Sequence, residues 1–147
     1  MSSPVMLVDI YDPLRFFGFC VSRDGQERVF FHASAFMRLD QHDKVPPIPG
    51  EPVEVTVRDD VVLKEGQNHK ATMVRRVVKP REVLGRVRSF DARNGWGFIE
   101  DEHNRMCFLH RADMVNQRIP VIGDDVLFYE GTGKGGRVRA CAVRFRE

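Results

Sequence analysis

An internal repeat runs through the 147 residues of this chain and limits the folds it can adopt. Arg15–Cys20 reads RFFGFC and aligns with Asn94–Ile99, which reads NGWGFI, at an offset of 79 residues. Val29–His32 (VFFH) aligns in turn with Cys107–His110 (CFLH), at an offset of 78 residues. Self-similarity at one spacing indicates a repeated structural unit, so we expect two homologous modules of about 70 residues each.

We place the first module at residues 1–78 and the second at residues 79–147. The pattern VEVTV over residues 53–57 alternates apolar and polar side chains, as a half-buried strand does, and no long amphipathic helical pattern occurs. Short antiparallel strands with a long loop before the fourth favour a closed barrel, which leaves no exposed sheet edge. The expected fold class is therefore all-β, with two small five-stranded antiparallel OB-type barrels in tandem. The predicted strands lie near residues 5–11, 16–22, 27–32, 52–58 and 69–77, and near 84–90, 95–101, 105–110, 124–130 and 136–145.

Aromatic side chains recur two residues apart in both motifs of each module. Residues two apart in a strand share a face of the sheet, so each module should present four flat rings on one surface. Soluble domains normally bury large rings, and nucleic-acid bases are the commonest flat groups that stack on exposed ones. The rings concerned are Phe17, Phe19, Phe30 and His32 in the first module, and Trp96, Phe98, Phe108 and His110 in the second.

The formal net charge of the whole chain is only +2, which by itself does not indicate a nucleic-acid-binding protein. The charge is uneven, however. Residues 1–78 contain ten Lys or Arg and eleven Asp or Glu, a net charge of −1, whereas residues 79–147 contain thirteen and ten, a net charge of +3. The second module is therefore the more favourable place for contact with a polyanion.

Three cysteines, Cys20, Cys107 and Cys141, stand singly in apolar runs. This spacing is typical of reduced, buried cysteine in a cytosolic protein rather than of a disulfide framework. No stretch approaches the roughly 20 apolar residues that cross a membrane, and the N-terminus lacks the pattern of a signal peptide. We expect a cytoplasmic protein with no membrane association.

The two motifs, in this order and at this spacing, resemble those of the cold-shock domain family. That family has a first motif of the form Lys-Gly-Phe-Gly-Phe-Ile and a second of the form Val-Phe-Val-His, and the resemblance covers nearly the whole chain. It implies OB-type barrels that bind single-stranded RNA or DNA, with rings stacking on bases and basic side chains contacting phosphates. The residues that the resemblance assigns to this role are Tyr11, Arg15, Phe17, Phe19, Phe30 and His32, and Arg88, Phe90, Trp96, Phe98, Phe108 and His110.

The chain also departs from the family pattern. Ile10 and Ser89 stand where the family usually has a tryptophan, Asp9 replaces a lysine, and Phe16 replaces a glycine. Most of these departures fall in the first module. They motivate an alternative function, in which one or both ring surfaces, and the first above all, bind a protein partner.

Other chemistry is weakly indicated. Cys107 and His110 have metal-like spacing but are only two ligands, and they face opposite sides of one predicted strand. Gly131–Gly136 lacks the pattern of a phosphate-binding loop. No pairing of a nucleophile with a base is evident, so we expect no enzyme activity, metal or cofactor. The leading hypothesis is a single-stranded nucleic-acid-binding protein that acts as an RNA chaperone or as a regulator of transcription or translation.

Overall fold

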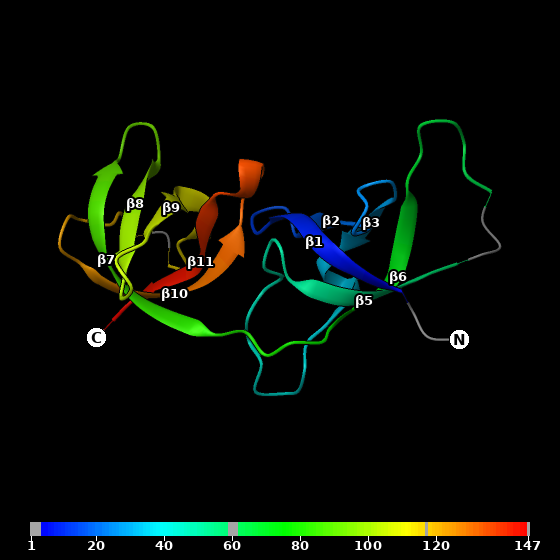
Figure 1. The fold of residues 1–147 in the computed structure, drawn as a ribbon, viewed down its shortest axis with the longest axis horizontal. Coiled ribbons are helices and arrows are strands. Elements are labelled where there is room, and N and C mark those ends of the chain that lie inside the picture. The colour runs from blue at the N-terminus through cyan, green and yellow to red at the C-terminus, as the bar shows by residue number, and fades with distance from the viewer. Residues whose placement is uncertain (1–3, 59–61, 117, 147) are drawn as a thin grey trace. The chain divides into compact units, whose positions relative to one another are not determined.

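The structure is a computed structural model that describes residues 4–58, 62–116 and 118–146. The chain forms two compact units, Met1–Lys79 and Pro80–Glu147, whose strands can be followed in Figure 1. Across the described residues the regular structure consists of β-strands and three short 3₁₀ turns. No helix in this part of the chain is long and apolar enough to cross a membrane.

The first unit is a barrel closed by a parallel pairing between its third and last strands. Its sheet has the order β3-β2-β1-β5-β6, and pairing of β3 with β6 completes the ring. A two-residue strand that the sequence pattern did not predict, β4, adds to β6 after a 3₁₀ turn at Ala33–Ala35. The strands are β1 (Val5–Asp12), β2 (Phe17–Val21), β3 (Arg28–His32), β4 (Phe36–Met37), β5 (Pro52–Val57) and β6 (His69–Arg76).

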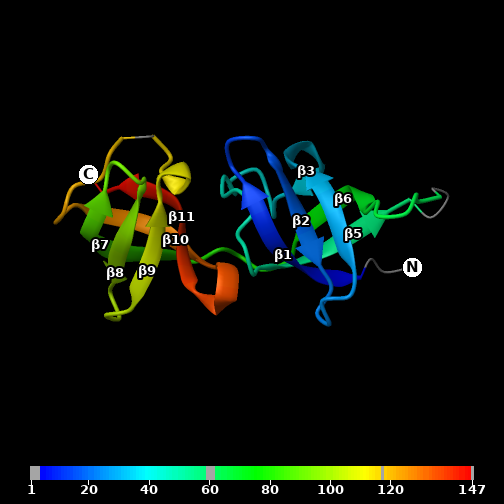
Figure 2. The same cartoon turned by 90° about the horizontal axis from the view of Figure 1, so that it is seen from above.

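The second unit repeats this plan as a closed five-stranded barrel of order β10-β11-β9-β8-β7. Figure 2 shows β7, β8 and β9 side by side, and these strands carry the second copy of the sequence motifs. The predicted all-β fold with two five-stranded barrels in tandem is therefore confirmed. The strands are β7 (Glu82–Asp91), β8 (Trp96–Asp101), β9 (Met106–His110), β10 (Asp125–Thr132) and β11 (Val138–Phe145), with 3₁₀ turns at Arg111–Asp113 and Lys134–Gly136.

Each barrel has its own apolar core, built from the side chains that alternate with the motif rings. Phe31 and Leu109 occupy equivalent places in β3 and β9, and both are fully buried. Cys20, Cys107 and Cys141 are buried, and none of them forms a disulfide within the described part of the chain, in agreement with the sequence analysis. The alternation along each strand thus sends one set of side chains into the core and leaves the other set on the outer face.

A β-bulge in the first unit explains the central glycine of its first motif. The pairing of β1 with β2 shifts register between Val8 and Ile10, which leaves Asp9 as an extra residue on the bulged strand. A Cβ atom on Gly18 would lie 2.4 Å from the carbonyl oxygen of Ile10. Only glycine fits so close to the bulged backbone.

The second unit has the same bulge. The register of β7 against β8 shifts between Val87 and Ser89, which makes Arg88 the extra residue. A Cβ atom on Gly97 would lie 2.1 Å from the carbonyl oxygen of Ser89. The two bulge residues, Asp9 and Arg88, are therefore structurally equivalent but opposite in charge.

The long loop before β5 in the first unit is held by a buried arginine at the end of β6. Arg76 is 1% exposed, and its guanidinium donates hydrogen bonds to Asp43 (3.0 and 3.1 Å) and to Glu51 (2.8 and 2.7 Å). It also donates to the carbonyl oxygens of Val45 and Pro46 at 2.8 and 2.7 Å. Every charge in this network is paired, as burial of charged groups requires.

Candidate nucleic-acid interface

Three rings of the first unit gather on the outer face of β2 and β3. Phe19 pairs with Phe30 across these strands, and their ring centroids lie 5.6 Å apart. The ring of Phe17 lies 5.8 Å from that of Phe30 and 6.4 Å from that of Phe19. All three side chains are partly exposed. We call Phe17, Phe19 and Phe30 the first ring cluster.

The second unit repeats this arrangement on β8 and β9. The ring of Trp96 stacks beside that of Phe108 at 6.2 Å, and the ring of Phe98 lies 6.0 Å from each of them in edge-to-face geometry. Trp96 is 42% exposed. We call Trp96, Phe98 and Phe108 the second ring cluster. The expectation that alternate rings share one face therefore matches the geometry in both units, while their contact with nucleic acid stays a prediction.

The two motif histidines stand beside the ring clusters and also cap turns. His32 pairs with Phe17 and His110 with Trp96 across neighbouring strands, and both histidines are exposed. The Nδ1 atom of His32 accepts the backbone N–H of Ser34 at 3.1 Å, and that of His110 accepts the N–H of Ala112 at 3.0 Å. Neutral rings in this arrangement carry their proton on Nε2. The capping role is local chemistry that the motif alone did not reveal.

Tyr11 and Phe90 lie on the other side of the sheet from the ring clusters. The Tyr11 ring stacks on the buried Phe31 at 6.0 Å with an interplanar angle of 13°, and Phe90 packs against the core of the second unit. Burial raises the pKa of the Tyr11 phenol. Tyr11 pairs with Gly18, the residue between the exposed Phe17 and Phe19, and this places its side chain on the opposite face. The structure does not bring these two rings into the clusters.

The two arginines predicted to contact phosphate differ in how closely a neighbouring carboxylate pairs with them. Arg15 is an exposed turn residue whose Nε lies 3.9 Å from a carboxylate oxygen of Asp12. Arg88 donates a hydrogen bond from Nε to Glu100 at 3.1 Å, although half of its side chain remains exposed. A phosphate would have to share Arg88 with this carboxylate.

Two other arginines lie against the rings, a placement that sequence reasoning did not predict for either of them. The guanidinium carbon Cζ of Arg28 lies over the Phe19 ring, 4.4 Å from its centroid, and that of Arg137 lies 5.4 Å from the centroid of Phe108. Arginines placed this way add a cation–π contribution to an aromatic surface. Arg28 stands two residues before Phe30 in β3, so strand parity could have placed it on the same face.

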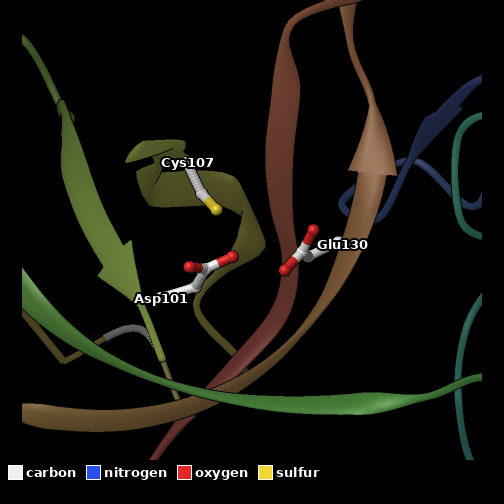
Figure 3. Close-up of side chains that lie close together, drawn as sticks. All are labelled: Asp101, Cys107 and Glu130. Atoms are coloured by element: carbon white, nitrogen blue, oxygen red, sulfur yellow. The ribbon is translucent and has the colours of Figure 1, made fainter. Parts of the chain in front are cut away.

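A separate cluster of ionisable side chains lies in the second unit. Figure 3 shows Asp101 of β8, Cys107 of β9 and Glu130 of β10 pointing toward one another, and their ligand-type atoms lie within 4.8 Å. Arg105 donates a hydrogen bond from Nε to Asp101 at 3.2 Å and a second from its guanidinium to Glu130. Two of the three side chains that could hold a cation, Asp101 and Glu130, are thus already bridged by an arginine.

The protonation states in this cluster follow from burial and hydrogen bonding. Burial raises the pKa of Glu130, and a hydrogen bond with Asp101 raises it further. Burial also acts to raise the pKa of Asp101, but hydrogen bonds from the backbone of Arg105 and other donors outweigh it and hold that pKa below its usual value. Burial raises the pKa of the Cys107 thiol to about 12. Asp101 and Glu130 therefore form a carboxyl pair that joins β8 to β10, beside Arg105 and the neutral thiol of Cys107. The sequence analysis did not predict this contact.

Comparisons with known proteins show a similarity at the level of solved structures. No family model matches the sequence, and no curated protein matches it. A solved structure titled "drosophila Unr CSD456" is similar, with a TM-score of 0.40 and 19% sequence identity over 100% of this chain. The chain spans 63% of the length of that structure. By its own architecture, the protein consists of two closed five-stranded β-barrels in tandem, each with a three-ring cluster on its outer face.

Proposed function

We propose that this protein binds single-stranded nucleic acid, with bases stacking on the ring clusters of two barrels of the cold-shock type. The observation that carries the proposal is the duplicated cluster. Three partly exposed rings lie within 6.4 Å of one another in each unit, on equivalent strands and in the same register. Two chance exposures of large rings would not repeat this geometry.

The rings supply enough free energy for passive binding. Stacking of a base on an aromatic side chain contributes about 1–3 kcal/mol and tolerates sequence, because every base has a π face. Two linked modules of about 10 µM affinity each, at an effective concentration of about 1 mM, would bind one strand near 0.1 µM. A protein that captures unpaired strands in this way disfavours RNA hairpins. We therefore infer an RNA chaperone or a regulator of transcription or translation that acts in the cytoplasm without catalysis.

Titration of fluorescently labelled single strands tests the proposal. Trp96 is the only tryptophan, so quenching of its fluorescence reports occupancy of the second ring cluster. The double variant W96A/F108A should weaken binding, and I119A provides a control because Ile119 is an exposed apolar residue (48%) outside the cluster. An absence of binding at low salt, or an affinity unchanged in W96A/F108A, would refute the proposal.

A second candidate function is supported by exposed apolar residues in the first unit. Phe16 is 55% exposed at a left-handed backbone position (φ 62°), where the second unit has Gly95 (φ 79°). Leu14 in the same turn is 60% exposed, and Ile10 beside Phe19 is 47% exposed. A strained, exposed aromatic residue is a feature found at functional sites. These residues support the alternative that the first unit binds a protein partner.

Separate variants of the two ring clusters discriminate between these candidates. Loss of strand affinity in both F17A/F30A and W96A/F108A supports nucleic-acid binding by both units. Loss in W96A/F108A alone, with F17A/F30A unchanged, favours a protein partner at the first unit. The variant F16N tests the exposed ring of Phe16 by itself. It removes the ring, and asparagine tolerates the left-handed conformation at this position.

A further inference from the structure

One corner of the first ring cluster is built differently from its counterpart in the second unit. Arg28 opens β3, two residues from Phe30, and so lies diagonally across from Phe19 on the same face. Its Cζ lies 4.4 Å from the centroid of the Phe19 ring, and its Nη1 lies 2.5 Å from a carboxylate oxygen of Asp9. The side chains of Arg28 and Asp9 remain 39% and 40% exposed. The guanidinium of Arg28, held by Asp9, therefore covers part of the Phe19 ring, while part of the ion pair stays exposed to solvent.

The equivalent corner of the second unit has no such cation. Met106 opens β9 at the place of Arg28 and is 49% exposed. Arg88 takes the bulge position of Asp9 and turns to Glu100 instead. Among the residues that the structure describes, no arginine is found over the Phe98 ring. The corner is thus a specific feature of the first unit rather than a general consequence of the fold.

We propose that Arg28 forms a nucleobase subsite of the first unit, in which a base stacks on the guanidinium that rests on Phe19. This inference rests on the proposed function and adds one residue to it, with the base on the guanidinium and the guanidinium on the ring. A guanidinium is planar and weakly hydrated, and arginine planes stack on nucleobases much as aromatic rings do. Asp9 fixes the guanidinium before the strand arrives, which lowers the ordering cost of binding.

The geometry favours stacking over the two other roles that such an arginine could have. As a phosphate contact, Arg28 would bring Asp9 with it, and the neighbouring carboxylate would offset most of the attraction. As a cover that merely blocks Phe19, it would have to leave before a base could bind. Stacking uses the guanidinium where it already lies and keeps its ion pair with Asp9 intact.

Three variants of the full-length chain separate these roles. R28M places the residue of the second unit at this corner, and R28K keeps the positive charge but loses the plane. R75M is the matched control, because Arg75 is also an exposed arginine of the first unit in an ion pair, 2.7 Å from Glu54. Binding is measured by fluorescence anisotropy with labelled single strands of about 12 nucleotides, a length that one or two OB-type sites can cover.

We expect the dissociation constant to rise about fivefold or more in both R28M and R28K, the loss of one stacked base, and less than about twofold in R75M. Wild-type affinity in R28K would identify a phosphate contact and overturn the subsite. Tighter binding by R28M would identify a cover and overturn it as well. Unchanged binding by both Arg28 variants would leave the proposed function standing and refute only the subsite, whereas a wild-type chain that binds no strand would refute both.

A direct readout does not depend on affinity. In a heteronuclear NMR spectrum of arginine Nε–H groups, the Arg28 signal is assigned by its absence in R28K. A stacked base shifts this signal upfield through its ring current, while the Arg75 signal should stay in place. An Arg28 signal that does not move at saturating strand concentration would refute the subsite even if the variants bind weakly.

Discussion

The two units share their backbone plan and ring clusters but differ in the charged side chains around them. In the first unit, the bulge residue Asp9 is acidic and pairs with Arg28, whose guanidinium lies on Phe19. In the second, the bulge residue Arg88 is basic and pairs with Glu100 at 3.1 Å. The bulge residue thus forms an ion pair in both units, but its charge is reversed and its partner comes from a different strand, β3 in the first unit and β8 in the second. In the proposed function, the rings determine the class of ligand, and the surrounding charges determine how each unit binds it.

The internal supports of the two barrels differ as well. The first unit buries Arg76 among Asp43, Glu51 and two carbonyl groups at the end of its last strand. At the corresponding end of β11, the second unit has Phe145, with the guanidinium carbon of Arg118 3.9 Å from its ring centroid. Its own charged network lies elsewhere, around Asp101 and Glu130. Equivalent folds therefore depend on different residues, and single substitutions should affect one unit at a time.

The largest effect is expected from R76M, which leaves two carboxylates of the first unit buried without their partner. Removal of one member of a buried charge network costs about 3–5 kcal/mol, so this unit should unfold at much lower urea concentration. Circular dichroism should then show two transitions, while Trp96 fluorescence follows only the second unit. R75M, an exposed arginine in an ion pair, should cost less than about 1 kcal/mol. A Trp96 transition that shifts together with the first would show that the units do not unfold independently.

Variants of the ring clusters should have the next largest effect, on binding rather than stability. We expect W96A/F108A to raise the dissociation constant for a single strand about 10-fold to 100-fold, the loss of one or two stacked bases. F17A/F30A should have a smaller effect, because the indole is the larger surface and the second half of the chain carries a net charge of +3 against −1. Anisotropy titrations measure both constants, and a larger loss in F17A/F30A would reverse the proposed ranking of the units.

The pH dependence of the second unit should change in E130Q. The raised pKa of Glu130 gives a stability contribution that is complete below its ordinary pKa of 4.5 and is lost as pH rises through the folded value. The lowered pKa of Asp101 acts in the opposite sense, with a contribution present above 3.8 and lost as pH falls through the folded value. Glutamine stays neutral and can still donate to Asp101, so E130Q should lose less stability than the wild type as pH rises.

Urea unfolding followed by Trp96 fluorescence between pH 4 and 8 measures this difference. E82Q is the control, since Glu82 forms an exposed ion pair with Arg144 in the same unit. If the free energy of unfolding changes with pH equally in E130Q and in the wild type, the carboxyl pair does not control the stability of this barrel.

The smallest effect is expected from E100Q, which releases Arg88 from its ion pair. A freed arginine beside the second ring cluster should tighten strand binding about twofold at low salt and make the salt dependence steeper. E82Q again removes an acidic group of the same unit without touching the cluster. Titrations at several salt concentrations provide the comparison, and an unchanged salt dependence would exclude Arg88 as a phosphate contact.

Much of the architecture could be predicted because it depends on local periodicity. Alternation along β2, β3, β8 and β9 places the motif rings on one face and Phe31 and Leu109 in the core, whatever the rest of the barrel does. The repeat also predicted two barrels. The sequence could not assign Tyr11 and Phe90 to one face of the sheet. The bulges interrupt the alternation of β1 and β7, and only the strand pairing shows where the bulges fall.

The number of barrels, their five main strands and the parity of their rings follow from the amino-acid sequence, because they depend on a repeat and on a period of two residues. Which charges meet depends on the tertiary structure. The pairs Arg28 with Asp9, Arg76 with Asp43, and Arg105 with Glu130 join residues 19 to 33 positions apart. No local pattern links such positions, because barrel closure and strand register bring them together. The rings were therefore visible in the sequence, whereas the electrostatic setting that distinguishes the two units was not.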